Sequence, residues 1–282
     1  MVSIERCFAI EQVLSENRAQ LFAQPLKFQC VNEDLICARS VVIFSTHPGP
    51  LEFTYCGPPP VPDSLWTDWN FDPIVIIALL ALAWMSRKSL AGQAAVAVLF
   101  LAFISPLCAL SSALFSARVV HHILLVAVAA PLLAKVWPAK HKLQIAPAFV
   151  VSTVIFWSWH APPLYELALS NVGIYWIMQM TLLGSAIWFW RAVLDRRGSA
   201  VETLYFIIAA VAQMGLLGAI LTFAPVPLYE FHIGPSFNWG VTPLADQQLA
   251  GLIMWIPGNI PYAIVGIWLG RRGWTDMRDR FA

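Results

Sequence analysis

Long apolar runs recur along the chain from Pro73 onward, and they constrain the fold more than any other feature. A helix that crosses the hydrocarbon core of a bilayer needs about 20 residues. Seven runs approach that length, at residues 73–87, 90–109, 117–137, 144–160, 171–191, 201–223 and 246–269. Only helices and closed barrels satisfy the backbone inside lipid, and the short alternating runs of barrel strands are not seen. The sequence therefore predicts an all-α, polytopic membrane bundle of about seven transmembrane helices.

The composition agrees with a membrane protein. The chain is 59% hydrophobic and 12% charged, whereas an average soluble protein has about 25% charged residues. The net charge of +1 and the lack of a Lys/Arg patch interleaved with aromatic residues argue against a nucleic-acid partner. The expected surroundings of the chain are therefore a lipid bilayer and not nucleic acid.

Basic residues alternate between the connections and predict the orientation. They lie between the first and second, third and fourth, and fifth and sixth runs, and after the seventh. The other connections, at 110–116, 161–170 and 224–245, contain no Lys or Arg. Cytoplasmic loops of membrane proteins are enriched in these residues. We therefore expect the N-terminus outside and the C-terminus in the cytoplasm.

The first part of the chain differs from the rest. Residues 1–54 lack a secretory signal and any apolar run of membrane length. We interpret them as an N-terminal extension, either disordered or the product of an upstream start codon, and residues 55–282 as the seven-helix transmembrane domain. Four of the five Cys lie within the first 56 residues, and no two of them form a CxxC pair. We expect incidental thiols rather than a disulfide or a metal site.

Polar side chains collect at the predicted outer face. His122 opens the third run, His160 closes the fourth, His232 lies in the loop before the seventh, and Asp246 opens the seventh. Neutral imidazole is the commonest metal ligand, and a carboxylate often completes or orients the set. These four residues are therefore a candidate metal site, with His121, Met254 and Cys108 as weaker candidates. The alternative is a set of interfacial His side chains bonded to lipid headgroups, water or loop carbonyls.

Arg118 lies one helical turn before His122 and shares its helix face. A guanidinium is not expected to bind a metal. Two alternatives remain open, a charge pair with Asp246, Glu166 or Glu230, and a side chain that extends to the membrane interface.

The seventh run combines three features that bear on packing. Gly251 allows close approach of another helix. Pro257 and Pro261 remove backbone donors and bend the helix, with Asn259 between them. No hydrolase triad, P-loop, dinucleotide fingerprint or HExxH motif is found in the chain. We therefore expect no enzymatic activity.

Four segments, in this order and at this spacing, closely resemble the membrane-integral CtaG family of caa3-type cytochrome c oxidase assembly factors. They are "SARVVHHILLVAVAAPLLA", "FWSWHAPPLYELAL", "GLLGAILTFAPVPLYE" and "PLADQQLAGLIMWIPG". The resemblance covers about residues 55–270. It implies a multi-pass protein of the bacterial inner (plasma) membrane that helps a haem-copper oxidase to mature. It also implies copper as the ligand and cytochrome c oxidase, at subunit I or II, as the partner.

The resemblance carries over to His122, His160 and Asp246, which match the family's motifs. Many members have a second His where this chain has Arg118, and His121 lies about 100° away on the helix. Three alternatives to copper handling at the outer face are a copper ion transporter, a haem-binding membrane redox protein and a scaffold for oxidase helices.

Overall fold

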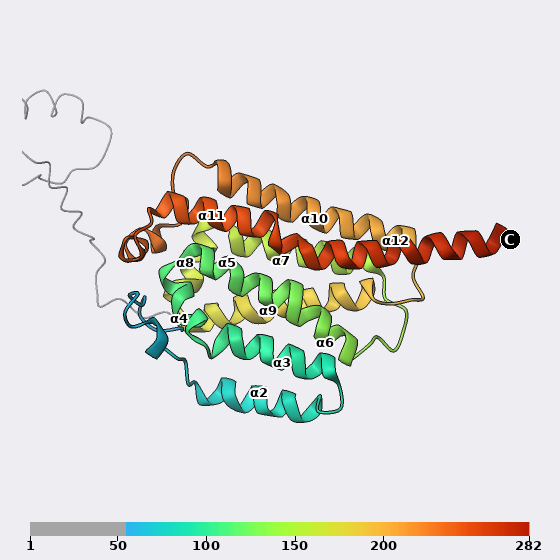
Figure 1. Cartoon of the computed structure of the whole chain (residues 1–282), viewed down its shortest axis with the longest axis horizontal. Coiled ribbons are helices and arrows are strands. Elements are labelled where there is room, and N and C mark those ends of the chain that lie inside the picture. Colours follow the sequence, from blue (N-terminus) through green and yellow to red (C-terminus); the bar gives the residue numbers. More distant parts are fainter. Residues whose placement is uncertain (1–54, 282) are drawn as a thin grey trace, which may run out of the picture. The chain divides into compact units, whose positions relative to one another are not determined.

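A computed structural model describes residues 55–281, and its elements are all helical (Figure 1). The predicted N-terminal extension lies outside the described residues. The elements are η1 (Leu65–Thr67), α2 (Pro73–Met85), α3 (Leu90–Phe103), α4 (Pro106–Ala113), α5 (Phe115–Ile123), η2 (Leu124–Ala129), α6 (Ala130–Val136), α7 (Ile145–His160), α8 (Pro162–Ser170), α9 (Val172–Val193), α10 (Ala200–Phe223), η3 (Glu230–His232), η4 (Pro235–Trp239), α11 (Pro243–Trp255), η5 (Pro257–Asn259) and α12 (Ile260–Phe281).

The helices are those of a membrane protein, but they do not add up to seven spans by length and composition. Within the described part of the chain, four helical segments are long and apolar enough to cross a bilayer: Phe115–Val136, Val172–Val193, Ala200–Phe223 and Pro243–Thr275. Two bent pairs, α3 with α4 and α7 with α8, raise the number to six if each pair is one span. The remaining apolar helix, α2, has 13 residues and is shorter than a full span.

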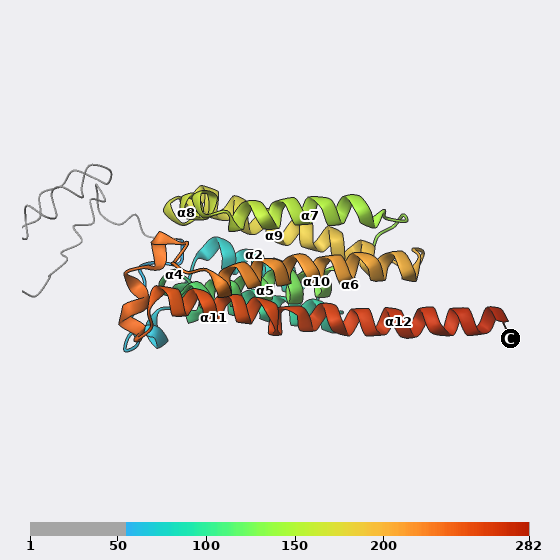
Figure 2. The same cartoon turned by 90° about the horizontal axis from the view of Figure 1, so that it is seen from above.

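The long helices run side by side, and their connections gather at two ends (Figures 1 and 2). One end, here called the Cys56 end, holds Cys56, α4, α8 and the segment 224–242. The other, here called the basic end, holds the connections 86–89, 137–144 and 194–199 and the last turns of α12. The four candidate site residues, His122, His160, His232 and Asp246, lie in the half of the bundle towards the Cys56 end.

Side-chain caps fix where most of these helices begin. An oxygen of the residue before the helix accepts hydrogen bonds from free N–H groups of the first turn. This holds for Asp72 before α2, Ser89 before α3, Ser105 before α4, Asn171 before α9, Ser199 before α10 and Thr242 before α11. α5, α7 and α8 have no such side-chain cap, and Leu114 before α5 offers no side-chain acceptor.

The span Phe115–Val136 changes its winding in the middle. Residues Leu124–Ala129 form a π-helical segment, η2, directly after His122 and Ile123. A π segment leaves carbonyls without their ordinary partners, and the indole Nε1 of Trp190 in α9 donates to the carbonyl of Val126 at 2.7 Å. A side chain from a neighbouring helix thus stabilises the irregular winding.

The backbones of α10 and α11 meet at two glycines. A Cβ at Gly251 would lie 2.5 Å from the carbonyl oxygen of Gly218, and a Cβ at Gly218 would lie 2.9 Å from the carbonyl oxygen of Gly251. The close approach expected at Gly251 is therefore confirmed. In the same span the short η5 turn separates α11 from α12, yet Pro243–Thr275 counts as one span. The bend expected at Pro257 and Pro261 stays a prediction.

Candidate functional site

His122 of α5 and His160 at the end of α7 form a pair of buried imidazoles. Their rings meet edge to face with centroids 5.8 Å apart. Nδ1 of His160 lies 2.7 Å from the carbonyl oxygen of Phe156. A carbonyl only accepts, so Nδ1 carries the proton and Nε2 keeps its lone pair. Nε2 of His122 is buried and has no hydrogen-bond partner. The pair therefore offers donor nitrogens that no protein group occupies.

His121 lies next to this pair but in a different environment. Its ring is fully buried and packs edge-on against Phe103 of α3, with centroids 5.1 Å apart. Its centroid is 5.8 Å from that of His122. His121 thus faces α3, as its position on the helix predicts, whereas His122 faces α7.

His232 forms a separate contact with α8. Its Nε2 lies 2.7 Å from the Tyr165 hydroxyl, and its Nδ1 lies 3.4 Å from the carbonyl oxygen of Ala113. Burial, and then the positive charge of Arg118, lower the pKa of His232 to about 3. The ring is therefore neutral near pH 7, with Nδ1 donating to the carbonyl and Nε2 accepting from the hydroxyl. Both of its nitrogens are already engaged.

Asp246 of α11 caps α5 from outside that helix. Its Oδ2 accepts from the N–H of Phe115 at 2.6 Å, and its Oδ1 accepts from the N–H of Ser116 at 3.2 Å and from the Ser116 hydroxyl. It supplies the acceptor that Leu114 lacks, and a negative charge is favourable at a helix N-terminus. Sequence reasoning did not find this role, because the two segments are 130 residues apart.

The neighbouring Gln247 holds the segment that follows α10. Its Oε1 accepts from the N–H of Leu228 at 2.6 Å, and its Nε2 donates to the carbonyl oxygens of Leu221 and Val226 at 3.3 and 3.5 Å. Asp246 and Gln247 at the start of α11 therefore hold two backbone segments by hydrogen bonds, the first turn of α5 and the segment that follows α10.

The predicted four-residue metal centre is not assembled in the described part of the chain. No group of three or more His, Cys, Asp or Glu side chains there is placed to hold a metal ion. His122 and His160 lie together, while His232 and Asp246 each bind other protein groups. Of the weaker candidates, Met254 is buried in the hydrophobic core, and Cys108 is bonded to another Cys.

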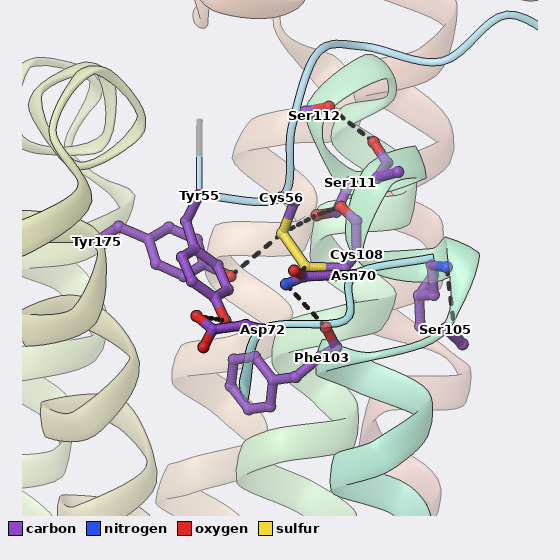
Figure 3. The surroundings of a disulfide bond; sticks show 12 residues. Tyr55, Cys56, Asn70, Asp72, Phe103, Ser105, Cys108, Ser111, Ser112 and Tyr175 are labelled. Atoms are coloured by element: carbon purple, nitrogen blue, oxygen red, sulfur yellow. Dashed lines mark hydrogen bonds between the residues drawn. A yellow bond between two sulfur atoms is a disulfide. The ribbon is translucent and has the colours of Figure 1, made fainter. Parts of the chain in front are cut away.

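Cys56 and Cys108 form a disulfide that ties the segment before α2 to α4 (Figure 3). Its surroundings are polar: the Tyr175 hydroxyl lies 3.5 Å from Sγ of Cys56, and Nδ2 of Asn70 donates to the carbonyl of Phe103 at 3.2 Å. The expectation of incidental thiols is wrong for this pair. The predicted topology placed both residues on the outer side, which was the signal available for the pairing.

Breaking this disulfide is expected to destabilise the protein. It closes a loop across a sequence separation of 52 residues, and such a bond typically contributes about 2–4 kcal/mol. The Cys56→Ser, Cys108→Ser double variant should therefore unfold at a lower temperature than the wild type in detergent. Reduction of the wild type should lower the unfolding temperature by a similar amount and leave the double variant unchanged. Equal unfolding temperatures for oxidised wild type and double variant would contradict a stabilising disulfide.

Arg118 is fully buried, and neither expectation for it holds. No carboxylate of the described residues lies within 4.0 Å of its guanidinium, and its side chain does not reach the surface. Its Nη1 lies 3.5 Å from the Tyr175 hydroxyl, and its guanidinium carbon lies 5.4 Å from the centre of the Tyr175 ring. Nε and Nη2 have no hydrogen-bond partner.

Comparison with known proteins gives one family. Residues 143–275 match the family model described as cytochrome c oxidase caa3 assembly factor (Caa3_CtaG). The matched range contains His160, His232 and Asp246, and it begins after His122. No curated protein and no solved structure matches the chain.

Proposed function

We propose that this chain helps a caa3-type cytochrome c oxidase to mature by holding copper for it at the outer membrane face, because residues 143–275 match the family model of such assembly factors. Its role is to hold and pass on a metal rather than to catalyse a reaction. The partner is cytochrome c oxidase at subunit I or II. The family match supports the assembly role, and the site's donor groups support copper.

We propose seven spans, with α2 as the short first one and with the Cys56 end outside the cytoplasm. Two independent observations support this orientation. Disulfides persist in oxidising compartments, and the Cys56–Cys108 bond lies at that end. Of the 13 Lys and Arg in residues 55–281, all but Arg118 lie at the basic end, as expected for the cytoplasmic side. In a bacterium, this arrangement fits a multi-pass protein of the plasma membrane.

The observation that carries the copper proposal is the His122–His160 pair. Two adjacent imidazoles are a donor set that suits copper, and the bond from His160 to Phe156 fixes the tautomer that leaves Nε2 free. Copper here is the cargo, not a resident cofactor. In this proposal His232 and Asp246 are not ligands. Asp246 positions α5, and His232 positions its loop beside the pair.

The first test is copper binding by purified protein in detergent. We expect the His122→Ala, His160→Ala double variant to lose at least about ten-fold in affinity for Cu(I). His141→Ala is the matched control, because that His lies at the basic end and is exposed. His232→Ala should affect stability more than copper affinity. Copper binding by the double variant equal to that of the wild type would exclude this pair as the site.

The second test separates copper delivery from its alternatives. A strain that lacks the protein should have low oxidase activity, and added copper should restore it if the protein delivers copper. Loss of oxidase subunits without rescue would favour a scaffold. A Soret band in the purified protein would favour haem binding, and copper transport by vesicles containing the protein would favour a transporter.

A further inference from the structure

A surface pocket lies at the basic end, where α6 and α9 finish. Its volume is about 610 Å³, and residues 136–141, Leu143 and Arg191 line it. Binding sites for small ligands have volumes of about 300–1,000 Å³. The pocket is thus large enough for a small ligand, and it lies away from the His122–His160 pair, which is in the other half of the bundle.

The lining of this pocket combines apolar surface with positive charge. Trp137 and Leu143 contribute apolar surface, and Lys140 and Arg191 contribute the charges. Among the described residues, no Asp or Glu lines the pocket. Nη2 of Arg191 donates to the carbonyl oxygen of Pro138 at 3.3 Å, whereas its Nε is buried and has no hydrogen-bond partner. These groups favour a ligand that has both an apolar part and a negative charge.

Basic residues outnumber acidic ones in the two segments that form the pocket. Residues 135–144 contain three Lys and no Asp or Glu. Residues 191–198 contain three Arg and one acid, Asp195. The two segments therefore have an excess of positive charge even with the carboxylate of Asp195 counted, and this excess attracts anions.

Arg197 fixes the backbone of the pocket without any ligand. Its guanidinium donates to the carbonyl oxygens of residues 139–141, each at 2.9 Å, and forms an ion pair with Asp195 at 2.8 Å. Oδ2 of Asp195 in turn accepts from the N–H of Leu143 at 3.2 Å. The connection between α6 and α7 is thus held to the turn after α9, so a ligand would find the pocket already formed.

The pocket lies where two membrane-spanning segments end. Lys135 is in the last turn of the segment Phe115–Val136, and Arg191 is in the last turn of Val172–Val193. Close to them in the sequence, the side chains of Trp137 and Trp188 are partly exposed, and Trp is enriched at membrane–water interfaces. At this depth the surroundings of the pocket are lipid headgroups.

We propose that this pocket binds one anionic glycerophospholipid from the leaflet at the basic end. Lys140 and Arg191 bind the phosphodiester group, and the apolar surface of Trp137 and Leu143 contacts the glycerol backbone and the first part of the acyl chains. Basic pockets between transmembrane helices on the cytoplasmic side bind anionic headgroups by the same chemistry. The lipid joins the connection between α6 and α7 to the end of α9, and its binding does not depend on copper.

The test is a titration of the delipidated full chain with phosphatidylglycerol in a non-ionic detergent, followed by native mass spectrometry. We expect one phosphatidylglycerol to bind before any further lipid does. Phosphatidylcholine, which has no net charge, should bind at least about five-fold more weakly. Inorganic phosphate should not displace the lipid, because it lacks the apolar part. Equal affinities for the two lipids, or displacement by inorganic phosphate at concentrations like those of the lipid, would overturn the proposal.

Charge variants locate the bound lipid. Each Lys or Arg near a membrane surface strengthens the binding of anionic lipid about five-fold, so the Lys140→Gln, Arg191→Gln double variant should bind phosphatidylglycerol about 25-fold more weakly. Arg87→Gln, Lys88→Gln is the matched control, because both side chains are exposed at the basic end and neither lines the pocket. This control should bind the lipid as tightly as the wild type.

A second variant keeps the test valid if loss of Arg191 disturbs the fold. Lys140→Glu changes an exposed side chain and leaves the bond from Arg191 to Pro138 in place. It should weaken phosphatidylglycerol binding more than Lys140→Gln does, because it reverses the charge. Wild-type affinity in Lys140→Glu, or an equal loss of affinity in the Arg87→Gln, Lys88→Gln control, would refute this site.

Discussion

Replacing Gly251 by alanine is expected to lower the free energy of unfolding by about 3 kcal/mol or more, the upper part of the range for overpacked cores. The new Cβ would lie 2.3 Å from the Thr222 hydroxyl, 2.5 Å from the Gly218 carbonyl oxygen and 2.8 Å from the Thr222 nitrogen. Two of these three atoms belong to the backbone of α10, so no side-chain rotation relieves the contact. The two helices would have to move apart.

Gly215→Ala is the control, because Gly215 lies on the face of α10 that packs against α11. A Cβ there would meet only the Trp255 ring, at 3.8 Å, which is ordinary contact. Alanine is also the better helix former by about 1 kcal/mol. We expect Gly215→Ala to unfold at or above the wild-type temperature and Gly251→Ala to unfold about 6–12 °C below it. Similar midpoints for the two variants would show that the backbones of α10 and α11 are not in close contact.

The sequence predicted the long helices well because their signal is local. The runs predicted at 117–137, 171–191 and 201–223 correspond to the observed spans Phe115–Val136, Val172–Val193 and Ala200–Phe223. An apolar run of membrane length specifies a helix whatever it packs against. α8 lies within the "HAPPLYELAL" segment and bends by 75° from α7, a direction that an apolar run alone does not specify.

The partners of the polar residues could not be predicted in the same way. The sequence placed His122, His160, His232 and Asp246 at one face of the bundle, but ligand type alone did not separate a metal ligand from a helix cap. Asp246 binds α5 because Leu114 leaves the first N–H groups without an acceptor, and this contact exists only after α11 packs against α5. Arg118 shows the same limit. The predicted topology placed Asp246, Glu166 and Glu230 on the same side of the membrane as Arg118, but it did not give the distances between them and the guanidinium.

Replacing Asp246 by alanine is the second change with a large expected effect. It removes the acceptor for the N–H groups of Phe115 and Ser116 and for the Ser116 hydroxyl, all of which are buried. A buried donor left without a partner costs about 1–3 kcal/mol, and loss of a helix cap alone costs about 1 kcal/mol. We therefore expect Asp246→Ala to lose about 3 kcal/mol of stability, measured as the unfolding midpoint in detergent.

Asp246→Asn and Asp72→Ala show whether the loss comes from this cap. Asn keeps one acceptor oxygen and no charge, so Asp246→Asn should lie between Asp246→Ala and the wild type. Asp72 caps α2 through Ile74 and Val75 and also accepts from the Tyr55 hydroxyl, in a more exposed position, so Asp72→Ala should cost about 1–2 kcal/mol. If Asp246→Ala lowered copper affinity as strongly as loss of both His122 and His160 while leaving the unfolding midpoint unchanged, Asp246 would be a ligand rather than the cap of α5. If it lowered stability alone, the polar start of α11 would act on the site only by holding α5 and its His122 in place.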